Sequence, residues 1–195
     1  MKEDVKITIF FNYLEELTRK YNEVFELKEK LLKELQERAM YDYLTGLYNR
    51  HVLIELLEKE IERVKREGEE RVFVVFLDLD NFKKVNDIYG HEKGDEVLKE
   101  VAKILRESFR KYDIVSRFGG DEFVALVPTK EGDKDQLLAR LVEIERRIEE
   151  AFSDFGISIS YGIAVAPDEG VNVSELINLS DKRMYMMKEK KKKRK

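Results

Sequence analysis

The run Val72-Phe73-Val74-Val75-Phe76-Leu77 constrains the fold of this chain more than any other feature. Six consecutive apolar residues, all of them β-branched, aromatic or leucine, are typical of a strand that is buried on both faces. The run ends in Asp78-Leu79-Asp80. Carboxylates at positions i and i+2 of a strand point to the same side. Burying such a pair is unfavourable unless a cation or hydrogen-bond donors neutralise it.

The rest of the chain alternates between helix and strand patterns. They predict helices over 49–67, 81–89, 92–110, 133–152 and 173–190, and strands over 71–80, 113–118, 122–127 and 156–166. Gly119-Gly120-Asp121 separates two apolar runs, which is typical of a hairpin turn. The order βααββαβ plus a terminal helix predicts an α/β fold. We expect an α+β sandwich, with helices packed on an antiparallel or mixed ferredoxin-like sheet.

Residues 10–41 predict one long, coiled-coil-like amphipathic helix, because no Gly or Pro occurs between residues 1 and 45. Its apolar stripe includes Leu14, Leu17, Tyr21, Val24, Leu31 and Leu35. Such a stripe must be buried against something. A two-stranded coiled coil with a second copy of the chain is the expected arrangement, and packing onto the chain's own globular part is the alternative. The chain therefore divides into a dimerising or signalling helix (1–41), a globular domain (42–190) and a basic tail (191–195).

Composition excludes several classes of protein. The chain has 195 residues, 43% of them hydrophobic and 40% charged, and it has no Cys, so disulfides and thiolate metal sites are ruled out. No apolar run approaches the roughly 18 residues of a membrane helix, and no signal peptide is visible. We therefore expect no membrane segment in this chain and a cytoplasmic location. The net charge is −4, yet residues 188–195 are almost all basic. That segment reads as a solvated helix end or as a contact for phosphate.

Four acids come from two distant stretches of the chain. Asp78 and Asp80 end the first buried strand, and Asp121 and Glu122 lie at the tip of the hairpin. If the hairpin pairs beside the first strand, the four acids meet at one end of the sheet. Carboxylates in a chain with no Cys and only two His favour a hard cation such as Mg²⁺. Solvated acids on a ferredoxin-like fold are the alternative interpretation.

The neighbouring residues suit phosphate. Lys83 and Lys84 lie near a predicted helix N-terminus, where main-chain amides also attract phosphate. Gly119 and Gly120 carry no side chains, so a ligand can approach the backbone closely. The residues by themselves therefore predict a nucleotide phosphate that is handled with Mg²⁺.

The segment Gly119-Gly120-Asp121-Glu122-Phe123 is also the signature of the GGDEF family of diguanylate cyclases. Further motifs resemble that family in register: Asp42-Tyr43-Leu44-Thr45-Gly46-Leu47-Tyr48-Asn49-Arg50, Asp78-Leu79-Asp80-Asn81-Phe82-Lys83 with Asn86-Asp87, Gly90-His91 with Gly94-Asp95, Arg117, and Asp181, Met184, Tyr185 and Lys188. The resemblance covers residues 42–188. It implies a nucleotidyl-cyclase palm that joins two GTP molecules into cyclic di-GMP with release of two pyrophosphates.

The resemblance also implies a metal centre. Asp78, the carbonyl of Leu79 and Asp121 would bind Mg²⁺, with Mn²⁺ as an alternative metal. Asp121, Glu122 and Lys83 would form the catalytic group, because the 3′-hydroxyl of one GTP attacks the α-phosphate of the other. Either acid would help to deprotonate that hydroxyl, and the residues leave open which one does.

Substrate contacts follow from the same motifs. By resemblance, Asn86 and Asp95 would hydrogen-bond the guanine edge. Lys83 and Lys188 would hold the β- and γ-phosphates, helped by amides around Phe82 and by the open backbone of Gly119 and Gly120. Each half-site holds one GTP, so catalysis implies a homodimer.

A second family pattern is Arg110-Lys111-Tyr112-Asp113, which matches the RxxD motif of a product-inhibitory site. By resemblance, Arg110 and Asp113, joined by Arg117, would grip bound cyclic di-GMP. The alternative is a surface ion pair. The chain departs from the family after Lys188, where Lys190 to Lys195 replace a Gly-Arg-Asn-like segment, and Lys192 takes about the position of a phosphate-contacting Arg.

Three other functions would each account for part of the sequence. A relative of the same fold would bind GTP or cyclic di-GMP without turnover, but such relatives usually lose signature acids and this chain retains them. A nucleic-acid binder would use the sheet and the basic tail. The chain lacks the aromatic strand motif of such binders, so we expect no nucleic-acid partner. A purely structural coiled-coil module leaves the acids unexplained.

Overall fold

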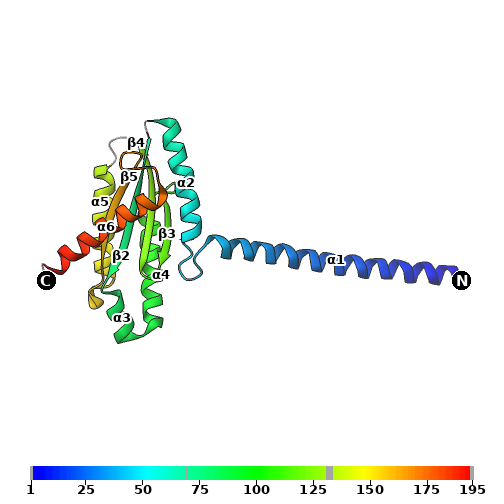
Figure 1. Cartoon of the computed structure of the whole chain (residues 1–195). Coiled ribbons are helices and arrows are strands. Elements are labelled where there is room, and N and C mark those ends of the chain that lie inside the picture. Colours follow the sequence, from blue (N-terminus) through cyan, green and yellow to red (C-terminus); the bar gives the residue numbers. More distant parts are fainter. Residues whose placement is uncertain (1, 69, 131–133, 194–195) are drawn as a thin grey trace. The chain divides into compact units, whose positions relative to one another are not determined.

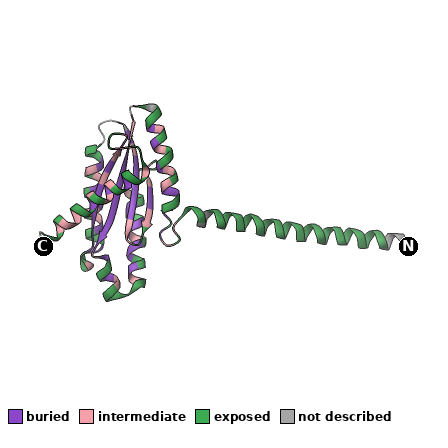
Figure 2. Cartoon of the chain, viewed as in Figure 1, coloured by how far each residue is buried: buried purple, intermediate pink, exposed green. Residues whose placement is uncertain are grey.

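The computed structural model describes residues 2–68, 70–130 and 134–193. The chain divides into two compact units, Met1–Ala39 and Met40–Lys195. The first unit is a single helix, α1 (Lys2–Met40), which confirms the predicted long N-terminal helix. Wherever its burial is described, α1 is exposed to solvent along its length (Figure 2). No helix in the described ranges is long and apolar enough to cross a membrane.

The second unit is built on a mixed five-stranded sheet (Figure 1). The strands are β1 (Tyr48–Asn49), β2 (Glu70–Asp80), β3 (Ile114–Gly119), β4 (Glu122–Lys130) and β5 (Ser158–Ala166), in the order β1-β3-β4-β2-β5. β2 lies between β4 and β5 and is antiparallel to both, whereas β1 is parallel to β3. The predicted ferredoxin-like sheet is therefore confirmed. Only the two-residue strand β1 was missed.

Helices cover both faces of this sheet, as Figure 1 shows. They are α2 (Arg50–Glu67), α3 (Phe82–Tyr89), α4 (His91–Ser108), α5 (Lys134–Ala151) and α6 (Val173–Lys192), with a short 3₁₀ turn, η1 (Ser153–Phe155). Alternate residues of β2 serve the two cores. Phe73, Val75 and Leu77 pack with α4 and α5, while Val74 and Phe76 pack with α2 and α6. The apolar run is thus buried on both faces, as its composition predicted.

Local sequence signals begin and end these helices. Asn49 caps α2, because its side-chain oxygen accepts a hydrogen bond from the amide of Val52 at 3.0 Å. Asn81 lies between β2 and α3 with a left-handed φ of 65°, a conformation that Asn tolerates better than most residues. Its side-chain amide donates to the carbonyl of Gly156 at 2.8 Å. This contact fixes the abrupt change from β2 to α3 beside the end of the central strand.

The helix α6 lies across β5 and β2 (Figure 1). Its close approach to β5 depends on Gly162. A Cβ atom added at Gly162 would come closer than 3.0 Å to the carbonyl oxygen of Ser180, the amide nitrogen of Met184 and Cβ of Arg183. All three belong to α6, and two are main-chain atoms that cannot rotate away. The backbone of β5 therefore touches that of α6 at this point.

The substitution Gly162→Ala should therefore push α6 off the sheet. Overpacking of this kind costs about 1–3 kcal/mol, which corresponds to a fall in melting temperature of roughly 2–4 °C per kcal/mol in a chain of this size. Thermal unfolding followed by circular dichroism measures it. Gly119→Ala is the matched control, because nothing lies within 4 Å of a Cβ atom added there. Equal stability of the two variants would contradict the proposed backbone contact.

Candidate active site

The two acidic stretches meet at one end of the sheet. Asp78, near the end of β2, lies directly opposite Glu122, the first residue of β4. One position further on, the amide of Leu79 donates to the carbonyl of Asp121 at 3.3 Å. The hairpin formed by β3 and β4 therefore pairs beside the first buried strand, which is the condition for the acids to converge. The N–H and C=O of one antiparallel strand residue face the same neighbouring strand, so the carbonyl of Leu79 is also directed toward the hairpin.

Asp78 is buried, and its side chain is only 11% exposed. Its partner is Lys188 of α6, whose ammonium forms an ion pair with the carboxylate. Burial raises the pKa of Asp78, and the charges of Asp121 and Asp80 raise it further, while Lys188 opposes them. The net pKa lies above the ordinary value, because burial and the neighbouring acids together outweigh the ion pair with Lys188.

Glu122 shares this environment. It is partly buried, and burial is the largest cause of its raised pKa. The negative charges of Asp78, Asp121 and Asp181 add to the effect, whereas Lys188 lowers the pKa. Neighbouring carboxylates therefore raise the pKa of both Asp78 and Glu122, and Lys188 opposes them at both. A cluster of carboxylates of this kind favours the binding of a further cation.

Asp80 has a structural role, although it lies only two residues from Asp78. Its carboxylate accepts hydrogen bonds from Ser158 at 2.9 Å and from Ser160 at 3.0 and 2.9 Å. The ammonium of Lys191 lies 3.5 Å away. Asp80 is thus satisfied by the protein itself and holds α6 to β5. Sequence reasoning missed Lys191 as its partner, because the residues lie 111 positions apart and share no motif.

The donor set at this edge suits Mg²⁺. Asp78, Asp121 and the carbonyl of Leu79 offer only oxygen ligands, which hard cations prefer. Among the described residues, no three His, Cys, Asp or Glu side chains are placed to hold a metal ion by themselves. The expected set contains only two such side chains. A site of this kind takes its remaining ligands from water and substrate phosphate, as Mg²⁺ sites commonly do.

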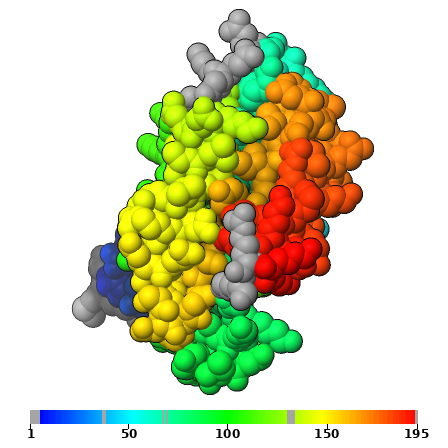
Figure 3. All heavy atoms as spheres, turned by 90° about the vertical axis from the view of Figure 1, so that its left-hand side faces the viewer, coloured from blue at the N-terminus to red at the C-terminus, as the bar shows by residue number. Residues whose placement is uncertain are grey.

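The start of α3 lies beside the acids. Phe82 is buried and anchors the helix, while Lys83 is exposed. No side chain caps this helix N-terminus, so its first amides remain available to a ligand. A cavity of about 310 Å³ opens next to it and is lined by Asp80, Asn81, Glu149, Ser158, Lys188, Lys191 and Lys192. Figure 3 views the unit from this side, with α6 in red and α5 in yellow.

The predicted guanine contacts come together between α3 and α4. The side-chain oxygen of Asn86 is buried and has no hydrogen-bond partner in the described structure. It packs so closely against Gly94 that an added Cβ atom would clash with it, and that Cβ would also lie 3.2 Å from Phe82. Asn86 therefore lies beside Gly94 and, next along α4, the exposed Asp95. A buried polar atom without a partner is costly and marks a place where a ligand can supply one.

The expected product-inhibitory residues lie at the far end of α4. The side chain of Asp113 is almost fully buried, and it accepts from the amide of Arg110 at 2.7 Å and from the guanidinium of Arg140 at 2.7 Å. The side chain of Arg110 is exposed and donates to Gln136 at 2.9 Å. Sequence reasoning missed Gln136 and Arg140, because they come from α5 and their spacing carries no signal.

Arg117 makes its contacts elsewhere. Its guanidinium donates to the carbonyl of Gly120 at 3.0 and 2.8 Å and pairs with Asp42 at 3.2 Å. Asp42 also accepts from the amide and hydroxyl of Thr45. Burial alone would raise the pKa of Asp42, but these hydrogen bonds and the charge of Arg117 outweigh burial, and the pKa is lowered. Arg117 therefore ties the turn after α1 to the hairpin that carries Asp121.

Fold and site together define an α+β domain whose central strand and hairpin form an acidic edge suited to a cation and a phosphate. Residues 39–194 match the family model described as "Diguanylate cyclase, GGDEF domain". The chain belongs to this family. The resemblance drawn from the motifs is thereby confirmed.

Named relatives and solved structures agree with this assignment. The chain is 40% identical over 156 residues to the diguanylate cyclase DgcS of Shewanella oneidensis, which covers 80% of this chain and 52% of that protein. It is 41% identical over 159 residues to the bifunctional diguanylate cyclase/cyclic di-GMP phosphodiesterase MucR of Pseudomonas aeruginosa, covering 80% of this chain and 23% of that protein. The chain thus spans about half of the first relative and about a quarter of the second.

Among solved structures, the coiled coil and GGDEF domain of DgcB from Caulobacter crescentus, in complex with c-di-GMP, has a TM-score of 0.75 at 26% identity. It covers 89% of this chain and 93% of that one. The diguanylate cyclase SiaD from Pseudomonas aeruginosa, in complex with its activator SiaC, has a TM-score of 0.67 at 31% identity, covering 92% of this chain and 70% of that one.

The lowered pKa of Asp42 predicts a pH-dependent stability contribution. Because the folded-state pKa lies below the ordinary value of 3.8, ionised Asp42 stabilises the folded protein above that pH. The contribution disappears as the pH falls through the folded-state pKa. Asp42→Asn should therefore lower the free energy of unfolding by about 1–2 kcal/mol at pH 7 and by much less near pH 3. Urea unfolding at both pH values measures the difference.

The exposed acid Asp154 supplies the control for this comparison. Asp154→Asn should change stability little at either pH, because surface substitutions of this kind usually stay within about 0.5 kcal/mol. A loss from Asp42→Asn that is equally large at both pH values would show that the charge of Asp42 contributes nothing.

Proposed function

We propose that this chain is a diguanylate cyclase that joins two GTP molecules into cyclic di-GMP and works as a homodimer. One observation carries the proposal. Asp78 on the central strand stands opposite Glu122 of the hairpin, with Asp121 bonded through its carbonyl to the next residue of that strand. Burial and the neighbouring charge of Asp121 raise the pKa of both Asp78 and Glu122, beside a helix N-terminus that no side chain caps.

Phosphate handling follows from this placement. Mg²⁺ or Mn²⁺, held by Asp78, Asp121 and the carbonyl of Leu79, would supply charge neutralisation for the α-phosphate and the leaving pyrophosphate. Lys188 and the exposed Lys83 would hold the β- and γ-phosphates, with the first amides of α3 assisting. Asp121 or Glu122 would accept the proton of the attacking 3′-hydroxyl. Gly119 and Gly120, both exposed, leave room for the substrate backbone.

Base selection would follow from polar groups on α3 and α4. A carboxylate at Asp95 accepts from the N1 and N2 donors of guanine, whereas adenine lacks that pair. Asn86 adds a second polar group, and its buried oxygen is without a partner in the described structure. A site built to hydrogen-bond a substrate group rejects analogues that lack it. Guanine nucleotides are therefore the expected substrates, and a GTP-consuming enzyme of this kind is expected in the cytoplasm.

Regulation would come from both ends of the domain. Arg110 and Asp113, supported by Arg140, would form a product-inhibitory site for cyclic di-GMP.

The apolar stripe of α1 would be buried against a second copy of the chain. Its exposed members include Leu14, Leu17, Tyr21, Val24, Leu31 and Leu35, a surface too apolar to remain in water. Two half-sites brought face to face would align the two GTP molecules.

The direct test is incubation of the purified chain with GTP and Mg²⁺, followed by chromatography of the product. Cyclic di-GMP should form, and Asp121→Asn should reduce its rate at least about a hundredfold. Asp168→Asn is the matched control, because Asp168 pairs with Arg71 near the start of β2 and so lies at the opposite end of the sheet. Binding of GTP without any product would favour the silent binding domain instead.

The ion pair between Lys188 and Asp78 gives a second prediction that does not depend on turnover. Without nucleotide, the ammonium of Lys188 competes with a divalent cation for the same carboxylate. Lys188→Met should therefore tighten Mn²⁺ binding to the nucleotide-free protein about fivefold to tenfold, the equivalent of roughly 1 kcal/mol. The same variant should weaken GTP binding. Isothermal titration measures both affinities.

Lys192→Met removes the same charge one turn further along α6. The partner of Lys192 is Glu189 rather than an acid of the sheet edge, so Mn²⁺ binding should remain within about twofold of the unsubstituted chain. Unchanged or weaker Mn²⁺ binding in Lys188→Met would show that Lys188 and the metal do not share Asp78.

A further inference from the structure

The outer edge of β5 is covered by side chains of α6. Because β5 is the last strand in the order β1-β3-β4-β2-β5, the backbone groups on its outer side cannot pair within the sheet. Unpaired backbone groups are costly when they are buried, and when exposed they can recruit another chain. Four alternate residues direct such groups to this side, namely Ile159, Tyr161, Ile163 and Val165.

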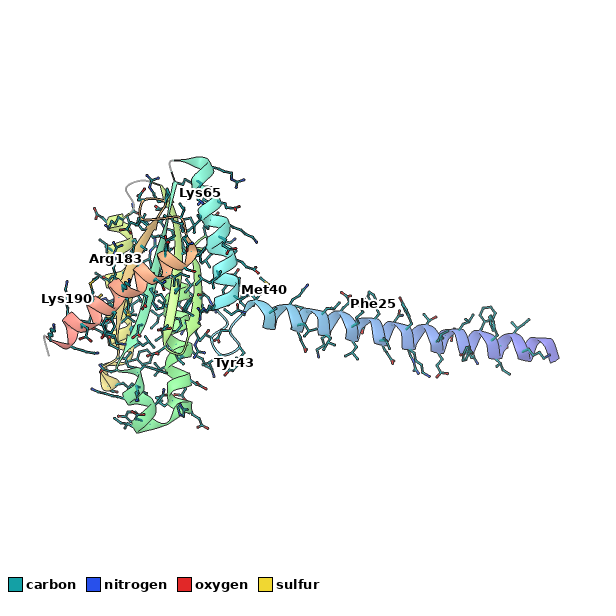
Figure 4. The ribbon with its side chains drawn as sticks, viewed as in Figure 1. Phe25, Met40, Tyr43, Lys65, Arg183 and Lys190 are labelled. Atoms are coloured by element: carbon teal, nitrogen blue, oxygen red, sulfur yellow. The ribbon has the colours of Figure 1, made fainter. Side chains whose placement is uncertain are left out.

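Three side chains of α6, spaced four residues apart, contact these groups in order. The contacts join Arg183 to the carbonyl of Ile163 at 2.6 Å, the sulfur of Met187 to the amide of Tyr161 at 3.3 Å, and Lys191 to the carbonyl of Ile159. We call Arg183, Met187 and Lys191 the edge ladder. Figure 4 labels Arg183 in the middle of α6 and Lys190 near its C-terminal end.

The edge ladder is possible because the repeats of a helix and a strand nearly coincide. Four residues of a helix rise about 6 Å, and two residues of a strand extend about 6.7 Å. Flexible side chains can absorb the small difference. A change of register by one residue would rotate the side chains by about 100° about the helix axis and take all three away from the edge. The edge ladder therefore fixes α6 on β5 both in position and in rotation.

Lys191 is the member of the edge ladder with the most partners. Besides the carbonyl of Ile159, its ammonium pairs with Glu145 of α5 and lies 3.5 Å from Asp80 of β2. One side chain thus joins the end of α6 to β2, β5 and α5. Lys191 also lies in the segment where the chain departs from the family pattern, so this anchor belongs to the chain's own sequence.

The neighbouring lysines of α6 remain available to a ligand. Lys188, Lys191 and Lys192 all line the cavity of about 310 Å³. Lys188 and Lys192 are four residues apart and so lie on one face of the helix. Lys188 reaches the acidic edge at Asp78, and Lys192 pairs with Glu189 of its own helix. Lys191 is the lysine whose charge is committed to residues of the surrounding fold.

We propose that Lys191 is a positioning residue for the phosphate site, which acts through the edge ladder to hold Lys188 at the acidic edge. This role rests on the proposed function, in which Lys188 holds the β- and γ-phosphates of GTP. Without Lys191, binding of the phosphates would also have to order the last turns of α6. Affinity for GTP should therefore fall, whereas the chemical step in the bound state should change little.

Steady-state kinetics of the full chain test this role. Lys191→Met should raise the KM for GTP about fivefold and leave kcat within about twofold. Lys191→Arg keeps the charge and a long side chain, and it should restore the KM to within about twofold. The matched control is Lys190→Met, which removes the same charge from the adjacent, exposed position. A lower kcat at an unchanged KM in Lys191→Met would overturn the proposal.

A double-mutant cycle separates positioning from a direct contact. The ligand is a GTP analogue with a methylene group between its α- and β-phosphates, which prevents release of pyrophosphate, and isothermal titration measures its affinity. Lys191→Met should weaken binding about fivefold in the unsubstituted chain and less than twofold in the Lys188→Met background, because Lys191 acts through Lys188.

The outcomes distinguish this role from the proposed function. Equal losses in the two backgrounds, together with formation of cyclic di-GMP from GTP, would refute the positioning role alone. The expected coupling between Lys188 and Lys191 without any cyclic di-GMP would refute the proposed function alone, because the titration requires no turnover.

Discussion

The structure depends on how the end of β2 accommodates two carboxylates in a buried position. The strand is enclosed by β4, β5 and helices on both faces, so Asp78 and Asp80 cannot rely on water for compensation. Their spacing of two residues corresponds to about 6.6–7 Å along the strand and keeps both on the α6 side. Lys188 and Lys191, three residues apart on α6, meet these two acids in turn. Charge compensation therefore requires α6 to dock at one register.

The two lysine–acid pairs differ in whether the carboxylate can still bind a ligand. Asp80 is bound by Ser158 and Ser160, and Lys191 also reaches Glu145 and the carbonyl of Ile159. That network is closed, and it holds α6 whether or not a ligand is present. Asp78 accepts a hydrogen bond from Lys188 and faces further acids. If Asp78 binds a divalent cation as proposed, Lys191 would still hold the helix and Lys188 would be free for a phosphate.

Much of this arrangement could be predicted from the sequence. The features that could not be predicted all depend on pairing between residues that are far apart in the chain. The run Val72–Leu77, the hairpin glycines and the 3.6-residue periods are local patterns, and the elements they predict agree with the structure. β1 was missed because two residues, Tyr48 and Asn49, form a strand only through pairing with β3. The partners Lys191 and Arg140 were missed because side-chain pairing across the fold leaves no local spacing. The sequence presents Asp78 and Asp80 as equivalent, and only the serines of β5 distinguish them.

The turn after α1 is held from two directions, and this links features that are far apart in the chain. Arg106 of α4 binds its carbonyls, while Arg117 of β3 binds Asp42 and the carbonyl of Gly120. Arg117 thus spans from the turn to the residue before Asp121, and Arg106 spans from the turn to the helix that ends beside Arg110. If the turn moves, either the hydrogen bonds from Arg106 and Arg117 break or the two side chains move with the turn. Because charge-assisted hydrogen bonds of this type are directional, the turn cannot shift independently of the hairpin and of α4. Hydrogen bonds therefore tie the turn both to the hairpin that carries Asp121 and to the end of α4.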